Sequence, residues 1–130
     1  MCQLTLFTLA SFTHDTFIKH NYLTFLSFQA LKCDYYFNVD SIAHLDNPGT
    51  LRALIEQNRA VLAPIIVRPF HAWSNFWGAL NKDGFYGRSH DYMDIVNAKR
   101  TGVWNVPFVN AVYLIKVMVV IDLHYLTDAT

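Results

Sequence analysis

Asp40 is the carboxylate whose position most suggests chemistry, because it directly follows Asp34–Val39, an aromatic and β-branched run that is typical of a strand. Two carboxylates spaced as D-x-D at such a strand end can hold Mn²⁺ or Mg²⁺, which neutralises a diphosphate as it leaves a sugar. Here the motif reads Asp40-Ser41-Ile42, and the next acid, Asp46, comes several residues later. We therefore interpret Asp40 as a degenerate metal ligand or, alternatively, as a turn residue at a strand end.

A second spacing suggests iron chemistry. His44 and Asp46 form an H-x-D motif, His90 follows later, and Arg100 lies ten residues after His90. Two histidines and one carboxylate form the facial triad of iron(II)/2-oxoglutarate dioxygenases, in which an arginine binds the co-substrate. That site needs a barrel of antiparallel strands, whereas the segment between Asp46 and His90 predicts a helix and a buried strand. With six histidines in the chain such a spacing arises easily by chance, so we expect no iron site here.

Motifs of other enzyme classes do not occur in the sequence. There is no P-loop, no nucleophile elbow and no dinucleotide glycine fingerprint, and Ser74 lacks the flanking glycines of a nucleophile. The rings of Trp73, Phe76, Trp77 and Trp104 could stack on sugars, but aromatic residues at a content of 15% more often form a core. We therefore name no catalytic or cofactor-binding residue.

Length and charge indicate one domain without a nucleic-acid surface. Of the 130 residues 53% are hydrophobic, which is enough for the core of a single domain. Ten Lys and Arg residues balance ten Asp and Glu residues, and the basic residues form no run of the kind that binds phosphate backbones. We therefore expect no nucleic-acid partner.

The apolar segments near the two chain ends do not resemble export or membrane signals. Residues 1–12 lack a basic start and are interrupted by threonines, unlike a secretory signal. Residues 112–126 are interrupted by charged residues and fall short of the roughly 20 apolar residues of a membrane span, so they predict a buried strand. Cys2 and Cys33 fit no zinc spacing, and whether they form a disulfide stays open.

The middle of the chain predicts a strand, a helix and a second strand in that order. Asn47 and Pro48 are suited to the N-cap and first position of a helix, which we expect to end near Asn58. Ala60–Val67 is nearly continuously apolar, as in a strand covered on both faces. Together with Asp34–Val39 these elements favour a right-handed β-α-β unit in an α/β fold.

The remaining elements are shorter. We expect a strand at Trp73–Leu80, a turn at Lys82–Gly84, a helical turn at Asp91–Asn97, and extended segments at Val103–Val106 and Ala111–Ile115.

Three long aromatic-rich strings resemble one protein family. They are CDYYFNVDSIAHLDNPGTLRALIEQNRAVLAPIIVRP, AWSNFWGALNKDGFYGRSHDYMDIV and GVWNVPFVNAVYLIK, and they cover about two thirds of the chain, from Cys33 to Lys116. They are similar to procollagen lysyl hydroxylases (procollagen-lysine 2-oxoglutarate 5-dioxygenases) and, more distantly, to collagen galactosyltransferases. The strings WSNFWGAL and GVWNVP favour the hydroxylase side.

The resemblance implies a large enzyme of the endoplasmic reticulum lumen. Such an enzyme has a glycosyltransferase domain, a glycosyltransferase-like accessory domain and an iron(II)/2-oxoglutarate dioxygenase that also uses ascorbate, and its sugar transfer uses Mn²⁺ with a UDP-sugar. Its partners would be collagen chains and the other domains of the parent enzyme. The matching residues correspond to the accessory domain, whose sugar-nucleotide site is degenerate, so His44, Asp46 and His90 inherit no iron role.

The resemblance also implies the fold and the domain limits. We expect an α/β fold with a partial GT-A-like (Rossmann-like) mixed sheet and flanking helices. The accessory-type domain would span residues 33–116, between a divergent segment at 1–32 and a divergent tail at 117–130.

Three functions follow as hypotheses. The first is a fragment of a procollagen lysyl hydroxylase that serves collagen modification as a non-catalytic module, inactive alone and without a cofactor of its own. The second is an active GT-A collagen glycosyltransferase that transfers galactose or glucose to hydroxylysine, and the third is a small dioxygenase.

Overall fold

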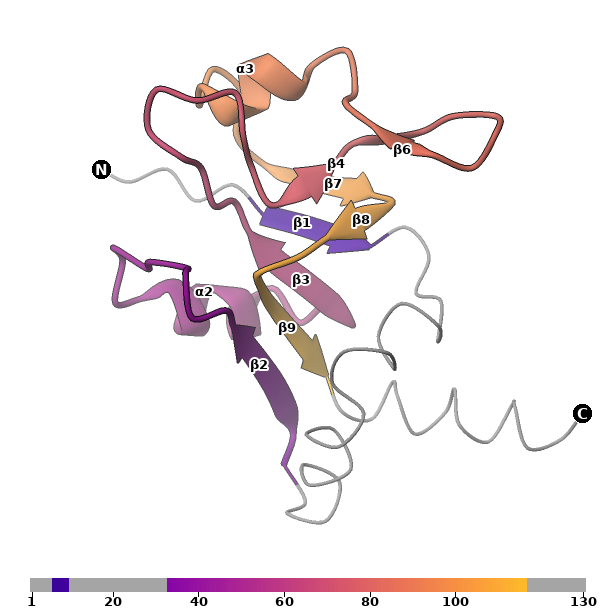
Figure 1. Ribbon diagram of the computed structural model, residues 1–130. Coiled ribbons are helices and arrows are strands. Elements are labelled where there is room, and N and C mark those ends of the chain that lie inside the picture. The colour runs from indigo at the N-terminus through magenta and orange to yellow at the C-terminus, as the bar shows by residue number, and fades with distance from the viewer. Residues whose placement is uncertain (1–5, 10–32, 117–130) are drawn as a thin grey trace, which may run out of the picture.

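The computed structural model describes residues 6–9 and 33–116 of the chain (Figure 1). The helices are α2 (Thr50–Glu56) and α3 (Tyr92–Val96). The strands are β1 (Leu6–Leu9), β2 (Tyr35–Val39), β3 (Val61–Pro64), β4 (Phe76–Trp77), β5 (Ala79–Leu80), β6 (Tyr86–Gly87), β7 (Val103–Val106), β8 (Phe108–Val109) and β9 (Val112–Lys116). No helix of the described part is long and apolar enough to cross a membrane.

The main sheet has five strands in the order β2-β9-β3-β1-β7. Strand β9 pairs antiparallel with both β2 and β3, so β2 and β3 run parallel to each other with β9 between them. Strand β1 is antiparallel to β3 and parallel to β7. The predicted mixed sheet with helices is therefore confirmed, but no Rossmann-like topology is seen among the described strands.

The order strand, helix, strand is confirmed as β2, α2 and β3, but its two strands are not neighbours in the sheet. The intervening β9 comes from the far end of the described chain, and most of its side chains are buried. A strand covered on both faces is stable in the centre of a sheet, where partners on both sides bond its backbone. The local sequence of the β-α-β unit cannot show that a later strand takes this place.

The two faces of the sheet carry different layers. On one face the register brings Phe37, Leu114 and Leu62 into a row across three strands. Leu54 of α2 packs in the same buried cluster. Ala63, whose side chain points to the opposite face of β3, packs in a second cluster with residues of β4, α3 and β7. The sheet is thus covered by α2 on one face and by α3 with β4 and β8 on the other (Figure 1).

Helix α2 begins at Thr50, two residues later than Asn47-Pro48 predicts. The Asn47 side chain accepts a hydrogen bond from the Gly49 N–H at 2.8 Å, and the Asn47 carbonyl accepts from the Thr50 N–H at 3.1 Å. Asn47 thus forms a turn of its own before the helix, as asparagine often does. The predicted end is confirmed, because Asn58 follows the C-cap with a φ of 48°.

The short helix predicted at Asp91–Asn97 is confirmed as α3. Its end is a Schellman motif, in which the Lys99 N–H donates to the Asp94 carbonyl at 2.8 Å and the Ala98 N–H donates to the Ile95 carbonyl at 3.0 Å. Ala98 takes the left-handed position of this motif, with a φ of 57°.

The single strand predicted at Trp73–Leu80 is wrong, because the chain forms two short strands that break at Gly78. Strand β4 pairs with β8, and β5 pairs with β6 in a hairpin. Gly78 lies so close to Ser89 that a side chain at position 78 would collide with it.

The turn predicted at Lys82–Gly84 is confirmed at the hairpin tip, where the Gly84 N–H donates to the Asn81 carbonyl at 3.1 Å. Strands at Val103–Val106 and across most of Ala111–Ile115 are confirmed as β7 and β9.

Candidate functional site

The carboxyl ends of β2 and β3 lie at the same edge of the sheet, on either side of β9 (Figure 1). Asp40 directly follows β2 and therefore lies at this edge. The Asp40 N–H donates to the Ala111 carbonyl at 2.8 Å, and the Asp40 carbonyl accepts from the Ala43 N–H at 2.9 Å. These bonds hold the backbone of Asp40 in a turn at the strand end. Its side chain is exposed.

The donor set around Asp40 contains no second carboxylate of the motif. Ile42 stands at that position and is 84% exposed. Asp46 bonds instead to His44, with 3.0 Å between its Oδ1 and the imidazole Nε2, and both side chains face solvent. Among the residues that the structure describes, no three His, Cys, Asp or Glu side chains gather to hold a metal ion. A metal role for Asp40 stays a prediction.

The chain reaches this edge through a strained corner before β9. Ala111 has a φ of 62°, and the Val112 N–H donates to the Asn110 carbonyl at 2.7 Å, which closes a three-residue turn. The Ala111 carbonyl accepts two bonds, one from Asp40 N–H and one from Asn38 Nδ2 at 3.0 Å. The corner is thus fixed to the end of β2.

Asn75 fixes the same corner to the end of β3, and sequence reasoning did not single it out. Its side chain is buried, with Nδ2 donating to the carbonyls of Pro64 at 3.0 Å and Asn110 at 3.2 Å. Its Oδ1 accepts from the Ile66 N–H at 2.8 Å. A buried asparagine keeps a low energy only when its amide is bonded in this way. The signal in the sequence was an asparagine inside the apolar string WSNFW.

Tyr36 adds a buried phenol on β2. Its hydroxyl donates to Asn38 Oδ1 at 3.3 Å, and burial raises the pKa of this phenol. Its ring lies 6.4 Å from the ring of Tyr113. Asn38 therefore joins the buried phenol on one side to the Ala111 corner on the other.

The residues with dioxygenase-like spacing are not brought together as a site. His44 and Asp46 lie in the loop before α2, His90 lies just before α3, and Arg100 pairs with Asp91 at 2.8 Å. The pKa of Asp91 is lowered, first by the hydrogen bond from Ser89 and further by the charges of His90 and Arg100. Arg100 thus binds a carboxylate of its own chain.

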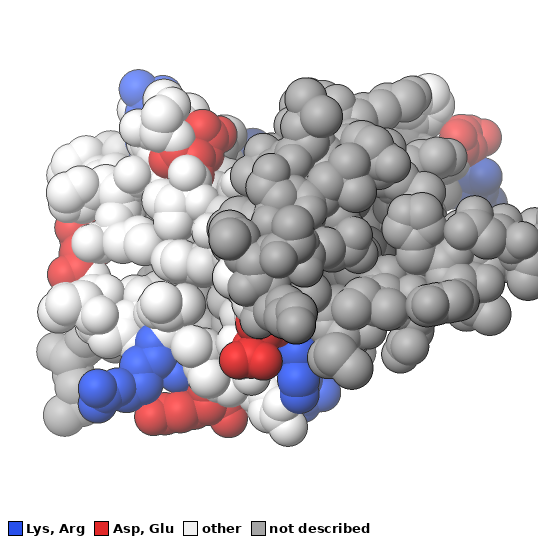
Figure 2. Space-filling model, turned by 90° about the horizontal axis from the view of Figure 1, so that it is seen from below, with Lys and Arg blue, Asp and Glu red and all other residues white. Residues whose placement is uncertain are grey.

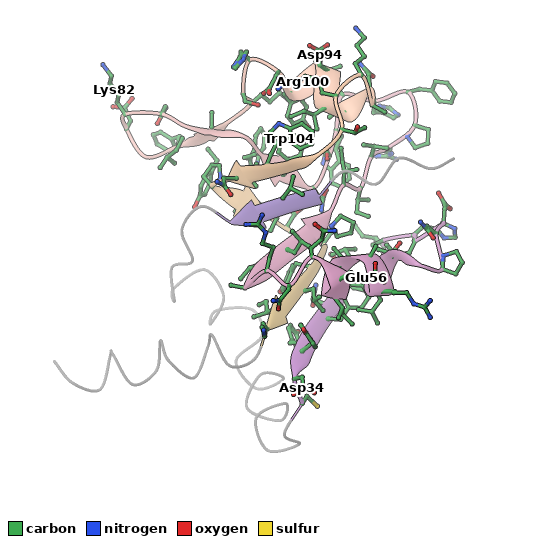
Figure 3. All side chains as sticks on the ribbon, turned by 180° about the vertical axis from the view of Figure 1, so that it is seen from behind. Asp34, Glu56, Lys82, Asp94, Arg100 and Trp104 are labelled. Carbon is green, nitrogen blue, oxygen red and sulfur yellow. The ribbon has the colours of Figure 1, made fainter. Side chains whose placement is uncertain are left out.

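The aromatic residues that could stack on sugars have different environments. Phe76 is buried against Tyr92, with ring centroids 4.9 Å apart, as expected for a core residue. Trp104 is half-buried, and the Arg100 guanidinium lies 6.0 Å from its ring on the side of α3 (Figure 3). Trp73 and Trp77 are exposed, so for these two the expected core position is wrong.

Acidic and basic side chains are interspersed on the face shown in Figure 2, over the part of the chain that the structure describes. No stripe of one sign forms there.

The chain is similar in sequence to a known protein family and to individual known enzymes. The family described as glycosyltransferase family 25, N-terminal domain, matches residues 9–126. Procollagen-lysine,2-oxoglutarate 5-dioxygenase 2 of Homo sapiens is 61% identical over 85 residues, and the corresponding enzyme 1 of Bos taurus is 58% identical over 84 residues. Each alignment covers 65% of this chain but only 12% of the relative. The predicted resemblance is confirmed: the chain is a homologue of procollagen lysyl hydroxylases and belongs to the glycosyltransferase family 25, N-terminal domain, family.

Proposed function

We propose that the chain acts as a non-catalytic, glycosyltransferase-like module of a procollagen lysyl hydroxylase and serves collagen lysine modification within the longer enzyme. It corresponds to a fragment of that enzyme and works in the endoplasmic reticulum lumen, with collagen chains and the neighbouring domains as partners. The observation that carries the proposal is the donor set at the sheet edge, where Asp40 stands without the second carboxylate of a D-x-D motif.

The donor set matters because a glycosyltransferase of the D-x-D type uses a bound cation to release the nucleotide diphosphate from the sugar. A hard cation such as Mn²⁺ or Mg²⁺ takes about six oxygen ligands, several of them charged. The motif Asp40-Ser41-Ile42 offers one carboxylate, and no three His, Cys, Asp or Glu side chains gather among the described residues, which does not fit a bound Mn²⁺ with a sugar-nucleotide diphosphate. We therefore assign no step of sugar transfer to this edge.

The amide groups at the same edge support the proposal. The Nδ2 and the Oδ1 of both Asn38 and Asn75 have hydrogen-bond partners within the protein. A side-chain amide that is already bonded within the protein is poorly placed to bind a ligand as well. These asparagines hold the sheet edge together, which is what a scaffold requires.

Calorimetry with Mn²⁺ and UDP-galactose or UDP-glucose tests the proposal directly. We expect no binding heat with the wild-type chain, with Asp40→Ala, or with the control Asp83→Ala, whose exposed carboxylate lies at the hairpin tip. The opposite result would be binding heat with the wild-type chain and with Asp83→Ala but not with Asp40→Ala. This result would contradict the scaffold function and favour an active GT-A collagen glycosyltransferase. The position of Asp40 directly after β2 makes that enzyme the second candidate.

A dioxygenase would need iron at His44, Asp46 and His90, and these residues do not form a cluster. Incubation of the chain with iron(II), 2-oxoglutarate and ascorbate should therefore release no more succinate than a His44→Ala control. Succinate that depends on His44 would contradict this expectation.

A further inference from the structure

Phe70 has two unfavourable features at one position. Its side chain is 106% exposed, and its backbone has a φ of 63°. It lies in the turn from Arg68 to His71, which is closed by a bond from the His71 N–H to the Arg68 carbonyl at 3.1 Å. Pro69 in second place and a positive φ in third place are the pattern of a type II turn.

Glycine or asparagine would suit the third position of this turn better than phenylalanine. A bulky residue at positive φ is strained, and a large apolar side chain gains nothing from full exposure to water. Neither the strain nor the exposure is explained by the folding of this loop. Backbone strain of this kind is typical of functional positions, where it is kept because the side chain is needed there.

The loop that carries Phe70 is held in place at its base. The Asn75 N–H donates to the Ile66 carbonyl at 3.3 Å, Val67 and Ser74 form a bridge, and the Arg68 N–H donates to the Trp73 carbonyl at 3.4 Å. We call residues Arg68–Trp73, which project beyond this base, the Phe70 prong.

A second element fixes the prong from the side. Arg88 Nη2 donates to the Ala72 carbonyl at 2.7 Å, while the Arg88 guanidinium lies 4.9 Å from the centroid of the Tyr92 ring in α3. The prong therefore presents Phe70 in a defined position, so a partner binds it without first having to order the loop.

The charged residue of the prong, Arg68, is basic. No acidic residue occurs between Glu56 and Asp83 in the sequence, and within the prong Arg68 and His71 are exposed beside Phe70. Trp73 at the end of the prong is 43% exposed and adds a second ring. A complementary ligand has apolar side chains to cover the rings and carboxylates to pair with Arg68.

We propose that the Phe70 prong is a docking site for an acidic peptide segment that carries apolar side chains. The apolar side chains pack on Phe70 and Trp73, and the Asp or Glu side chains of the peptide pair with Arg68. This interaction is separate from the sheet edge at Asp40 and holds whether or not that edge binds a sugar nucleotide.

Selection from a display library of random twelve-residue peptides against the full chain tests the proposal. We expect enriched peptides to combine aromatic or aliphatic residues with Asp or Glu. A synthetic enriched peptide should bind Phe70→Gly at least about tenfold more weakly than it binds the wild-type chain. Phe70→Tyr keeps an aromatic ring and should bind the peptide about as well as the wild-type chain does. Arg68→Glu should weaken binding of the same peptide.

Two controls keep the result interpretable. Phe85→Ala removes another exposed phenylalanine, at the hairpin tip beside Asp83, and should leave peptide binding unchanged. The thermal midpoint of Phe70→Gly should equal or exceed that of the wild-type chain. Weaker peptide binding by this variant then cannot be explained by unfolding. Enrichment that survives Phe70→Gly, enriched peptides without acids, or binding only to vesicles of phosphatidylserine and phosphatidylcholine would each overturn the proposal.

Discussion

Asn75 and Asn110 are joined by two hydrogen bonds that run in opposite directions. The Asn110 N–H donates to the Asn75 carbonyl at 2.9 Å, and Asn75 Nδ2 donates back to the Asn110 carbonyl at 3.2 Å. Because Asn75 also bonds to Pro64 and Ile66, this pair connects the end of β3 to the corner from which β9 enters the sheet. The placement of β9 between β2 and β3 is secured at this point.

Asn75→Ala should therefore lower the free energy of unfolding by about 2–4 kcal/mol, because three backbone groups in two segments, at Pro64, Ile66 and Asn110, lose the partner that the Asn75 side chain gives them. Urea titration followed by circular dichroism measures the change. Asn105→Ala, at an exposed asparagine of β7, should change the same quantity by less than about 0.5 kcal/mol. Equal effects of the two substitutions would contradict the role given to Asn75.

Local patterns predicted the elements of the middle of the chain. The strand before Asp40, the helix that ends near Asn58 and the β7 strand at Val103–Val106 all occur, because residue type and periodicity act over a few neighbours. The order of strands in the sheet did not follow, since the position of β9 depends on contacts between residues far apart in sequence.

The candidate site also combines features that local sequence predicts with features that depend on distant residues. That Asp40 follows a strand could be predicted, because the strand ends at polar residues. The Ala111 corner could not, because alanine gives no sign of a positive φ, and the bonds from Asn38 and Asn75 that hold the corner come from two distant segments. The apolar segment at 112–126 was tested only in part, since residues 117–126 lie outside the described residues.

Ala98→Gly should stabilise the protein by up to about 1 kcal/mol. Ala98 occupies the left-handed position after α3, where an alanine pays a steric cost that glycine avoids. Ala53→Gly is the matched control inside α2, where glycine should instead destabilise by about 1 kcal/mol. Thermal unfolding of the two variants should shift in opposite directions, and a shift of both to lower temperature would show that the Schellman end is not strained.

Asp91 should make stability depend on pH in the acid range. Its pKa lies below the usual 3.8 in the folded chain, so its contribution is complete above that value and is lost as pH falls through the lower folded pKa. Asp91→Asn removes the charge that Ser89 and Arg100 stabilise and should lower the free energy of unfolding at pH 7 by about 0.5–1 kcal/mol.

The difference between wild type and Asp91→Asn should therefore shrink when urea titrations are repeated below pH 3.8. Comparing the two chains at each pH removes the effect of the other carboxylates, which titrate in both. A difference that stays constant from pH 7 to pH 3 would mean that the Asp91 charge does not stabilise the fold.

Gly78→Ala should destabilise the protein by about 1–3 kcal/mol, because a Cβ at position 78 would lie 2.8 Å from the Cβ of Ser89. Gly87→Ala is the matched control, since a Cβ at position 87 meets no atom within 4 Å and the change should be small. Replacing Ser89 by glycine in the Gly78→Ala background should recover part of the loss measured by urea titration. If the double variant is no more stable than Gly78→Ala alone, contact with Ser89 is not the reason that the strand breaks at Gly78.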